Sequence, residues 1–150
     1  MIVVEAADPR DAAPAALLAQ AQAFQAQIYA DEHNHSLPIN ALAADDVRFF
    51  AAREGEALLG VGALKLCGDY GEVKSMFTAD AGRGKGIAAA ILRMLEDTAR
   101  DEGLAWLKLE TGDELDAACR LYERHGFARC GAFGGYADNG VSVFYEKPLG

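Results

Sequence analysis

This chain of 150 residues contains few cysteine, histidine and tryptophan residues: three cysteines, three histidines and one tryptophan. The cysteines, Cys67, Cys119 and Cys130, are far apart, odd in number and in none of the spacings typical of zinc sites. Their number and spacing argue against a disulfide framework and against a cysteine metal centre. They predict buried thiols in a reducing compartment, and we therefore expect a cytoplasmic location.

Long apolar runs and an excess of positive charge are also missing. No stretch of 18 or more apolar residues occurs, and the N-terminus lacks the basic and apolar regions of a secretory signal, so no membrane association is expected. Asp and Glu number 23 against 14 Lys and Arg, a net charge of −9, which argues against nucleic-acid binding. The length favours a single domain over residues 1–150 with its own core.

Helical and strand-like patterns of apolar residues follow one another along the chain. Helices are predicted after Asp11, with a stripe that includes Phe24, and over 41–44, 87–102 and 114–125. Strands are predicted over 2–6, 47–53, 57–66, 71–78, 105–111, 127–130 and 141–147. This order predicts an α/β (α+β) domain with a mixed sheet, antiparallel at first and parallel across the helical crossover between 71–78 and 105–111.

The loop before the helix at 87–102 carries three glycines and two cations, Gly82-Arg83-Gly84-Lys85-Gly86. Cations are unfavourable at a helix N-terminus, where the helix dipole is positive, unless an anion is also present. Backbone N–H groups of a glycine-rich loop at a helix N-terminus bind phosphate oxygens well. The spacing fits neither the dinucleotide fingerprint nor a Walker A motif. We therefore predict a site for a pyrophosphate group.

Two motifs resemble those of the GNAT superfamily of N-acetyltransferases. The segment 83–88 (RGKGIA) matches the phosphate-loop pattern Gln/Arg-x-x-Gly-x-Gly/Ala at every fixed position, and 121–127 (LYERHGF) is similar to Leu-Tyr-x-x-x-Gly-Phe. The resemblance implies a GNAT-like, mostly antiparallel sheet flanked by helices, with a central β-α-β unit that binds acetyl-CoA. It also implies direct attack by a primary amine of a small molecule or peptide in a ternary complex. Dimers are common in this family, so a homodimer is one expected assembly.

The resemblance assigns the acyl donor to two segments. The pyrophosphate would be held by residues of the loop: Arg83, Gly84, Lys85, Gly86, Ile87 and Ala88. Main-chain groups of a bulged strand would hold the pantetheine arm and polarise the acetyl carbonyl: Met76, Phe77 and Thr78. One departure concerns Leu115, which stands where many relatives carry an asparagine that bonds to the pantetheine arm.

Two residues are implied in proton transfer. Tyr122 would protonate the leaving thiolate, because a phenol within hydrogen-bond reach can do so; a core aromatic is the alternative. Glu72 would accept the proton of the amine through water, and strand alternation predicts that it shares one face with Lys74, Met76 and Thr78. An ion pair with Lys74 is the alternative for Glu72, and a water chain could make a base unnecessary.

Tyr29, His33 and Tyr136 belong to segments that would form the acceptor side. A metal site is not expected, because His33 and His35 are too few ligands in a polar loop. A different class of function also fits the phosphate loop: a non-catalytic acyl-CoA-binding or sensing module, which would not need Tyr122.

Overall fold

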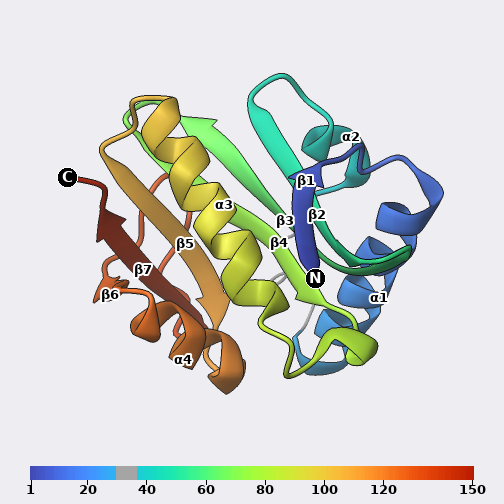
Figure 1. The fold of residues 1–150 in the computed structure, drawn as a ribbon. Helices are drawn as coiled ribbons and strands as arrows, with labels where there is room; N and C mark the ends of the chain where they lie inside the picture. The colour runs from blue at the N-terminus through green and yellow to red at the C-terminus, as the bar shows by residue number, and fades with distance from the viewer. Residues whose placement is uncertain (30–36) are drawn as a thin grey trace.

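The computed structural model describes residues 1–29 and 37–150 (Figure 1). Seven strands of this part of the chain form one sheet in the order β1-β2-β3-β4-β5-β7-β6. Their bounds are Ile2–Ala6 (β1), Val47–Glu54 (β2), Ala57–Cys67 (β3), Tyr70–Thr78 (β4), Trp106–Gly112 (β5), Ala128–Cys130 (β6) and Ser142–Pro148 (β7). Neighbouring strands run antiparallel except β4 and β5, which are parallel. The predicted fold class is confirmed.

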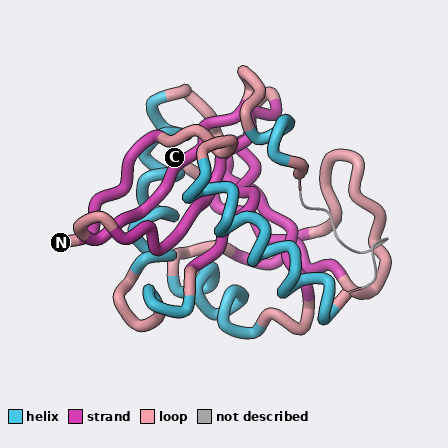
Figure 2. The backbone as a smooth tube through the Cα atoms, turned by 90° about the vertical axis from the view of Figure 1, so that its right-hand side faces the viewer, coloured by secondary structure: helices cyan, strands magenta, loops and turns pink. Residues whose placement is uncertain are grey.

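Helices cover both faces of the sheet. They are α1 (Ala12–Ile28), α2 (Ile39–Leu42), α3 (Ile87–Asp101) and α4 (Asp116–Arg124), with a short 3-10 turn, η2 (Asp80–Gly82). Figure 1 shows α3 and α4 on one face and α1 on the other, and Figure 2 shows the same layers from the side. No helix within residues 1–29 and 37–150 is long and apolar enough to cross a bilayer.

The core is divided by the sheet into two apolar clusters. The larger lies under α3, whose predicted inward side is buried: Ile87, Ile91, Leu92, Leu95 and Ala99. This helix lies close to β3, because a Cβ atom at Gly62 would be only 2.6 Å from Cγ2 of Ile91. The smaller cluster lies under α1 and includes Leu17 and Leu18. The predicted stripe of α1 is wrong at Phe24, which is 43% exposed.

The parallel strands β4 and β5 separate partway along their length. Their pairing runs from Tyr70 opposite Trp106 to Val73 opposite Leu109 and then stops, while β4 continues beside β3 to Thr78. The resulting gap between two parallel strands opens the centre of the sheet.

A bulge in β4 begins at the same point. Lys74 pairs with Ala63 and Phe77 with Val61, so Ser75 and Met76 together oppose one residue of β3, and Ser75 has a φ of +58°. Met76 packs in the cluster under α3, whereas Lys74 shares the opposite face with Ala63. Glu72 and Lys74 share one face as predicted, but the prediction that Met76 and Thr78 lie on the same face as these two is wrong, because the extra residue reverses the alternation.

Candidate active site

The glycine-rich loop forms an open turn at the N-terminus of α3. Gly84 and Gly86 both have a φ of +77°, and a Cβ atom at either would meet nothing within 4 Å. Glycine is required there by the backbone conformation rather than by crowding. The helix begins at Ile87, and the N–H groups of its first turn have no partner within the helix. The loop therefore presents backbone donors and a positive helix end on an open surface.

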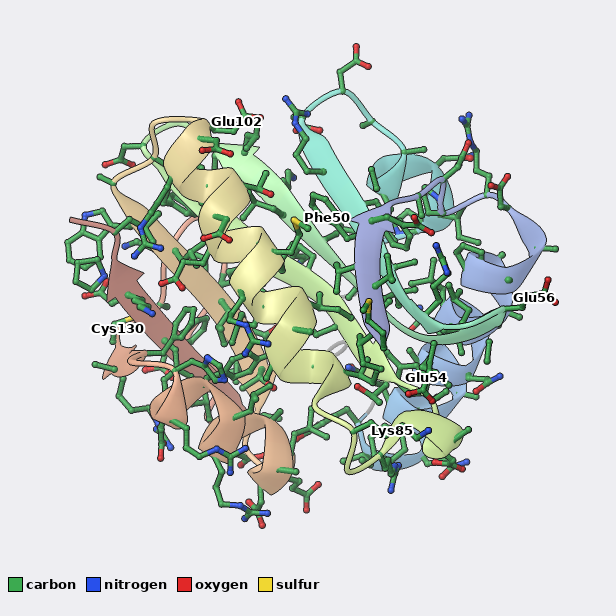
Figure 3. All side chains as sticks on the ribbon, in the orientation of Figure 1. Phe50, Glu54, Glu56, Lys85, Glu102 and Cys130 are labelled. Carbon is green, nitrogen blue, oxygen red and sulfur yellow. The ribbon has the colours of Figure 1, made fainter. Side chains whose placement is uncertain are left out.

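The two cations of this loop are held by carboxylates. The Arg83 guanidinium lies 3.2 Å from Asp80, and both side chains are largely exposed. The Lys85 ammonium lies 2.6 Å from the carboxylate of Glu54 at the end of β2, and both residues are labelled in Figure 3. This contact lowers the pKa of the Glu54 carboxyl. The contact with Glu54 was not predicted, because Glu54 and Lys85 are 31 positions apart in the chain. Exposed ion pairs contribute little free energy, so a phosphate group can replace either carboxylate.

A pocket of about 350 Å³ lies where β4 and β5 separate. Its wall includes Lys74 and Met76 of β4, Glu110 of β5, Tyr122 of α4 and Leu18 of α1. These residues come from both faces of the sheet, so the pocket connects the side of α3 and α4 with the side of α1. The volume is in the range of small-molecule sites, and the lining is mostly apolar with a few polar groups, as such sites usually are.

Tyr122 is 6% exposed and lies in the wall of this pocket. Its ring packs against Phe127 and Tyr145, with centroids 5.7 and 6.2 Å away. Its hydroxyl has no hydrogen-bond partner within residues 1–29 and 37–150. Burial, followed by the nearby Cys119 and Glu110, raises the pKa of Tyr122. The Tyr122 side chain is therefore both part of the apolar core and part of the pocket wall, and its phenol is neutral.

Glu72, Lys74 and Tyr136 form one hydrogen-bonded cluster. The Lys74 ammonium lies 3.2 Å from Glu72 and 2.6 Å from the Tyr136 hydroxyl, which in turn donates to Glu72. Burial, followed by the hydrogen bond to Glu72, raises the pKa of Tyr136. The ion pair expected as the alternative for Glu72 is thus present. Among the described residues, Lys74 lines the pocket, while Glu72 and Tyr136 hold it from outside the lining.

Tyr29 joins the end of α1 to the end of β5. Its hydroxyl accepts a hydrogen bond from the backbone N–H of Glu114 at 2.8 Å and donates to Asp113 at 3.4 Å. Its ring occupies the space that a Cβ atom of Gly112 would need. The side chain is buried and lines the pocket, as the prediction of an acceptor-side residue requires. The predicted His33 lies outside the described residues.

Two residues of the pocket had no assigned role from the sequence. Glu110 lines the pocket and accepts a hydrogen bond from Ser142 at 2.7 Å. A carboxylate between two buried positions of the strand was the available signal, because such side chains are rarely buried without a partner. Leu115 precedes α4 as its N-cap residue rather than lying within the helix, and it lines the pocket too. The helix predicted from residue 114 therefore begins two residues later.

Comparison with known proteins shows which protein family this chain resembles. The model of the acetyltransferase (GNAT) family matches residues 15–127. The chain is 37% identical to an IAA acetyltransferase of Azospirillum brasilense, and the match covers 99% of this chain and 98% of that protein. It is 42% identical to the uncharacterized N-acetyltransferase YedL of Escherichia coli, over 79% of this chain and 76% of that protein.

Solved structures show the same fold. A candidate acyl-CoA N-acyltransferase of Klebsiella pneumoniae is 32% identical and superimposes with a TM-score of 0.84, over 99% of this chain and 98% of that chain. An Elizabethkingia anophelis acetyltransferase with bound acetyl-CoA has a TM-score of 0.72 over 98% and 97% of the two chains. At 16% identity, the second likeness is one of fold.

Proposed function

Because this chain belongs to the acetyltransferase (GNAT) family, we propose that it transfers the acetyl group of acetyl-CoA to a primary amine of a small molecule or peptide. The observation that carries the proposal is the position of the pocket. It opens at the gap between β4 and β5, has Tyr122 in its wall, and lies beside the strand that leads into the glycine-rich loop.

The donor side is assigned to main-chain groups. The N–H groups of residues 84–88 would bind the pyrophosphate, with Arg83 and Lys85 exchanging their carboxylate partners for phosphate. Beyond Val73, the edge of β4 that faces β5 has no strand partner among the described residues. The amides of the pantetheine arm can pair with this edge at Met76, Phe77 and Thr78, much as a peptide adds to an open strand.

The chemistry needs charge stabilisation on the acetyl carbonyl and a proton for the departing sulfur. The bulge takes Ser75 and Met76 out of the regular ladder with β3, and pairing with β5 has already ended at Val73. Backbone N–H groups on this edge of β4 would stabilise a developing oxyanion. Tyr122 would donate to the leaving thiolate. Its raised pKa keeps the phenol protonated at neutral pH, and it also makes the group a hydrogen-bond donor more than a strong acid.

Two carboxylates can take the proton of the amine. Glu72 is the base predicted from the sequence, and it would act through the cluster that it forms with Lys74 and Tyr136. Glu110 borders the pocket and lies close enough to Tyr122 for its charge to raise the pKa of that phenol. Tyr29 and Tyr136 would shape the acceptor side. A direct attack requires donor and amine in one ternary complex, and a pocket that reaches both faces of the sheet allows it.

The first experiment is a calorimetric titration with acetyl-CoA, with free CoA for comparison, followed by an amine screen that detects thiol release. Micromolar binding of the donor together with turnover of any primary amine supports the proposal. Binding without turnover would favour the non-catalytic acyl-CoA-binding alternative. No binding at millimolar donor would refute both.

A further inference from the structure

The pocket contains a pair of opposite charges at adjacent positions of the two separating strands. Val73 and Leu109 are the last paired residues of β4 and β5, and Lys74 and Glu110 follow them directly. Val73 and Leu109 face α3, so alternation directs the next residue of each strand to the face of α1. Both Lys74 and Glu110 line the pocket.

These are the charged side chains of the pocket wall within residues 1–29 and 37–150. On the α1 side, the wall is otherwise formed by apolar and uncharged residues such as Leu18, Gln22 and Ile39. The Lys74 ammonium is buried together with the Glu72 carboxylate, and this ion pair offsets the cost of removing the charge from water.

Both charges are fixed in place by neighbours. Lys74 is 8% exposed, and Glu72 and Tyr136 hold its ammonium at 3.2 and 2.6 Å. Tyr136 is itself held by the rings of Phe133 and Phe144, with centroids 5.3 and 5.8 Å away. Glu110 is oriented by the hydroxyl of Ser142 at 2.7 Å. Preorganised charges recognise a ligand at a lower entropic cost than mobile ones.

We propose that the acceptor is a zwitterion with an apolar body, that is, a small amino acid whose carboxylate faces Lys74 and whose amino group faces Glu110. This inference rests on the proposed acetyl transfer and narrows its acceptor. The amine nitrogen forms a bond to the acetyl carbon as the carbon–sulfur bond breaks. The ammonium of the zwitterion loses one proton to Glu110 or to water before the attack, and the nitrogen loses a second proton as its bond to the acetyl carbon forms. Tyr122 gives its proton to the thiolate and regains one through water, so the products are an N-acetyl amino acid, free CoA and one proton.

The test compares three compounds that share one body: an amino acid, its amide and its decarboxylated amine. Leucine with leucinamide and isoamylamine, and phenylalanine with phenylalaninamide and phenethylamine, are suitable sets. We expect kcat/KM for the amino acid to exceed that for the amide and the amine by at least tenfold, because both lack the carboxylate that meets Lys74.

Variants assign this preference to one side chain. Lys74→Met should reduce the ratio of amino acid to amide at least fivefold, and Lys74→Arg should keep the preference for the carboxylate. Lys74→Met leaves the buried Glu72 carboxylate without its cation. Lys74→Gln provides the same test, because its amide can still donate a hydrogen bond to Glu72 and the candidate base is kept. Lys147→Met is the matched control. The Lys147 ammonium lies 2.5 Å from the Glu96 carboxylate in a similar ion pair, and Lys147 does not line the pocket.

Failure of this inference and failure of the proposed function give different results. Acetylation of the amide or the amine at least as fast as the amino acid overturns the inference and leaves amine acetylation standing. An unchanged ratio of amino acid to amide in both Lys74→Met and Lys74→Gln also overturns it. If acetyl-CoA binds and no compound of either set is acetylated, the inference falls, and the proposed function then depends on turnover of a peptide amine.

Discussion

Replacing Tyr122 with phenylalanine should separate the stability of the fold from the chemistry of the site. The hydroxyl is buried and has no hydrogen-bond partner among the described residues, so its removal costs no internal hydrogen bond. An unsatisfied buried hydroxyl itself costs about 1–3 kcal/mol. We therefore expect the free energy of unfolding to stay unchanged or to rise by up to ~1 kcal/mol.

The same substitution should lower kcat at least tenfold. A positioned proton donor contributes roughly 10²–10⁴ in rate, and a tenfold loss corresponds to about 1.4 kcal/mol of activation free energy. The affinity for acetyl-CoA should change little, because in the proposed mechanism the phenol contacts the reacting end of the donor rather than its phosphates. Thiol release measures kcat, calorimetry measures the affinity, and urea unfolding measures the stability.

Tyr145→Phe is the matched control. Tyr145 is fully buried, its ring packs beside that of Tyr122, and its hydroxyl donates to Glu123 at 2.6 Å. Burial, followed by the hydrogen bond to Glu123, raises the pKa of Tyr145 to about 12. Losing a hydrogen bond to a charged group that water can still reach should cost about 1 kcal/mol, or ~2–4 °C in Tm. Parental kcat in the Tyr122 variant, or a loss of stability equal to that of the control, would refute the reasoning.

Three further predictions concern other parts of the molecule. Arg83→Ala should weaken the binding of acetyl-CoA at least fivefold and leave that of N-acetylcysteamine thioester, which has no phosphate, unchanged; equal losses for both ligands would contradict a phosphate site. Glu110→Gln and Glu72→Gln distinguish the two candidate bases, since the variant that lacks the base should lose at least tenfold in kcat/KM at neutral pH while the other loses less than threefold; two parental rates would indicate a water chain. Burial, followed by neighbouring cations, lowers the pKa of His125 from its ordinary value of 6.5, so the folded state binds fewer protons than the unfolded state. Stability should therefore fall as the pH drops below about 6.5, and His125→Gln should reduce this fall in urea unfolding between pH 7 and 5; identical pH profiles would exclude the contribution.

Much of the fold was predictable because local pattern and packing agree. The helix from Ile87 carries apolar residues at helical spacing, and this spacing gave its buried face correctly. The hairpin of β2 and β3 followed from two apolar runs around Gly55, and the glycine-rich loop lies where the sequence placed it. These features depend on residues close in the chain, so a sequence contains nearly all the information that they need.

The errors have a common physical cause. The bulge at Ser75 adds one residue to β4 and places Met76 on the face opposite Lys74. The residue preferences of this segment do not predict the extra residue. Phe24 continues the apolar stripe of α1, yet its side chain is largely exposed in the folded chain. Both depend on what lies against the segment rather than on the segment itself.

The sequence by itself determined the order of the elements, the glycine-rich loop before α3 and the family, because each of these depends on short-range spacing of residue types. The tertiary structure alone decided which side chains meet. The separation of β4 from β5 after Val73 and Leu109 brings Lys74 and Glu110 to one pocket, and the loop that carries Tyr136 fixes the ammonium of Lys74 there. These contacts join residues that are 36 and 62 positions apart. Their geometry depends on how strands far apart in the chain pack together, which local residue preferences do not encode.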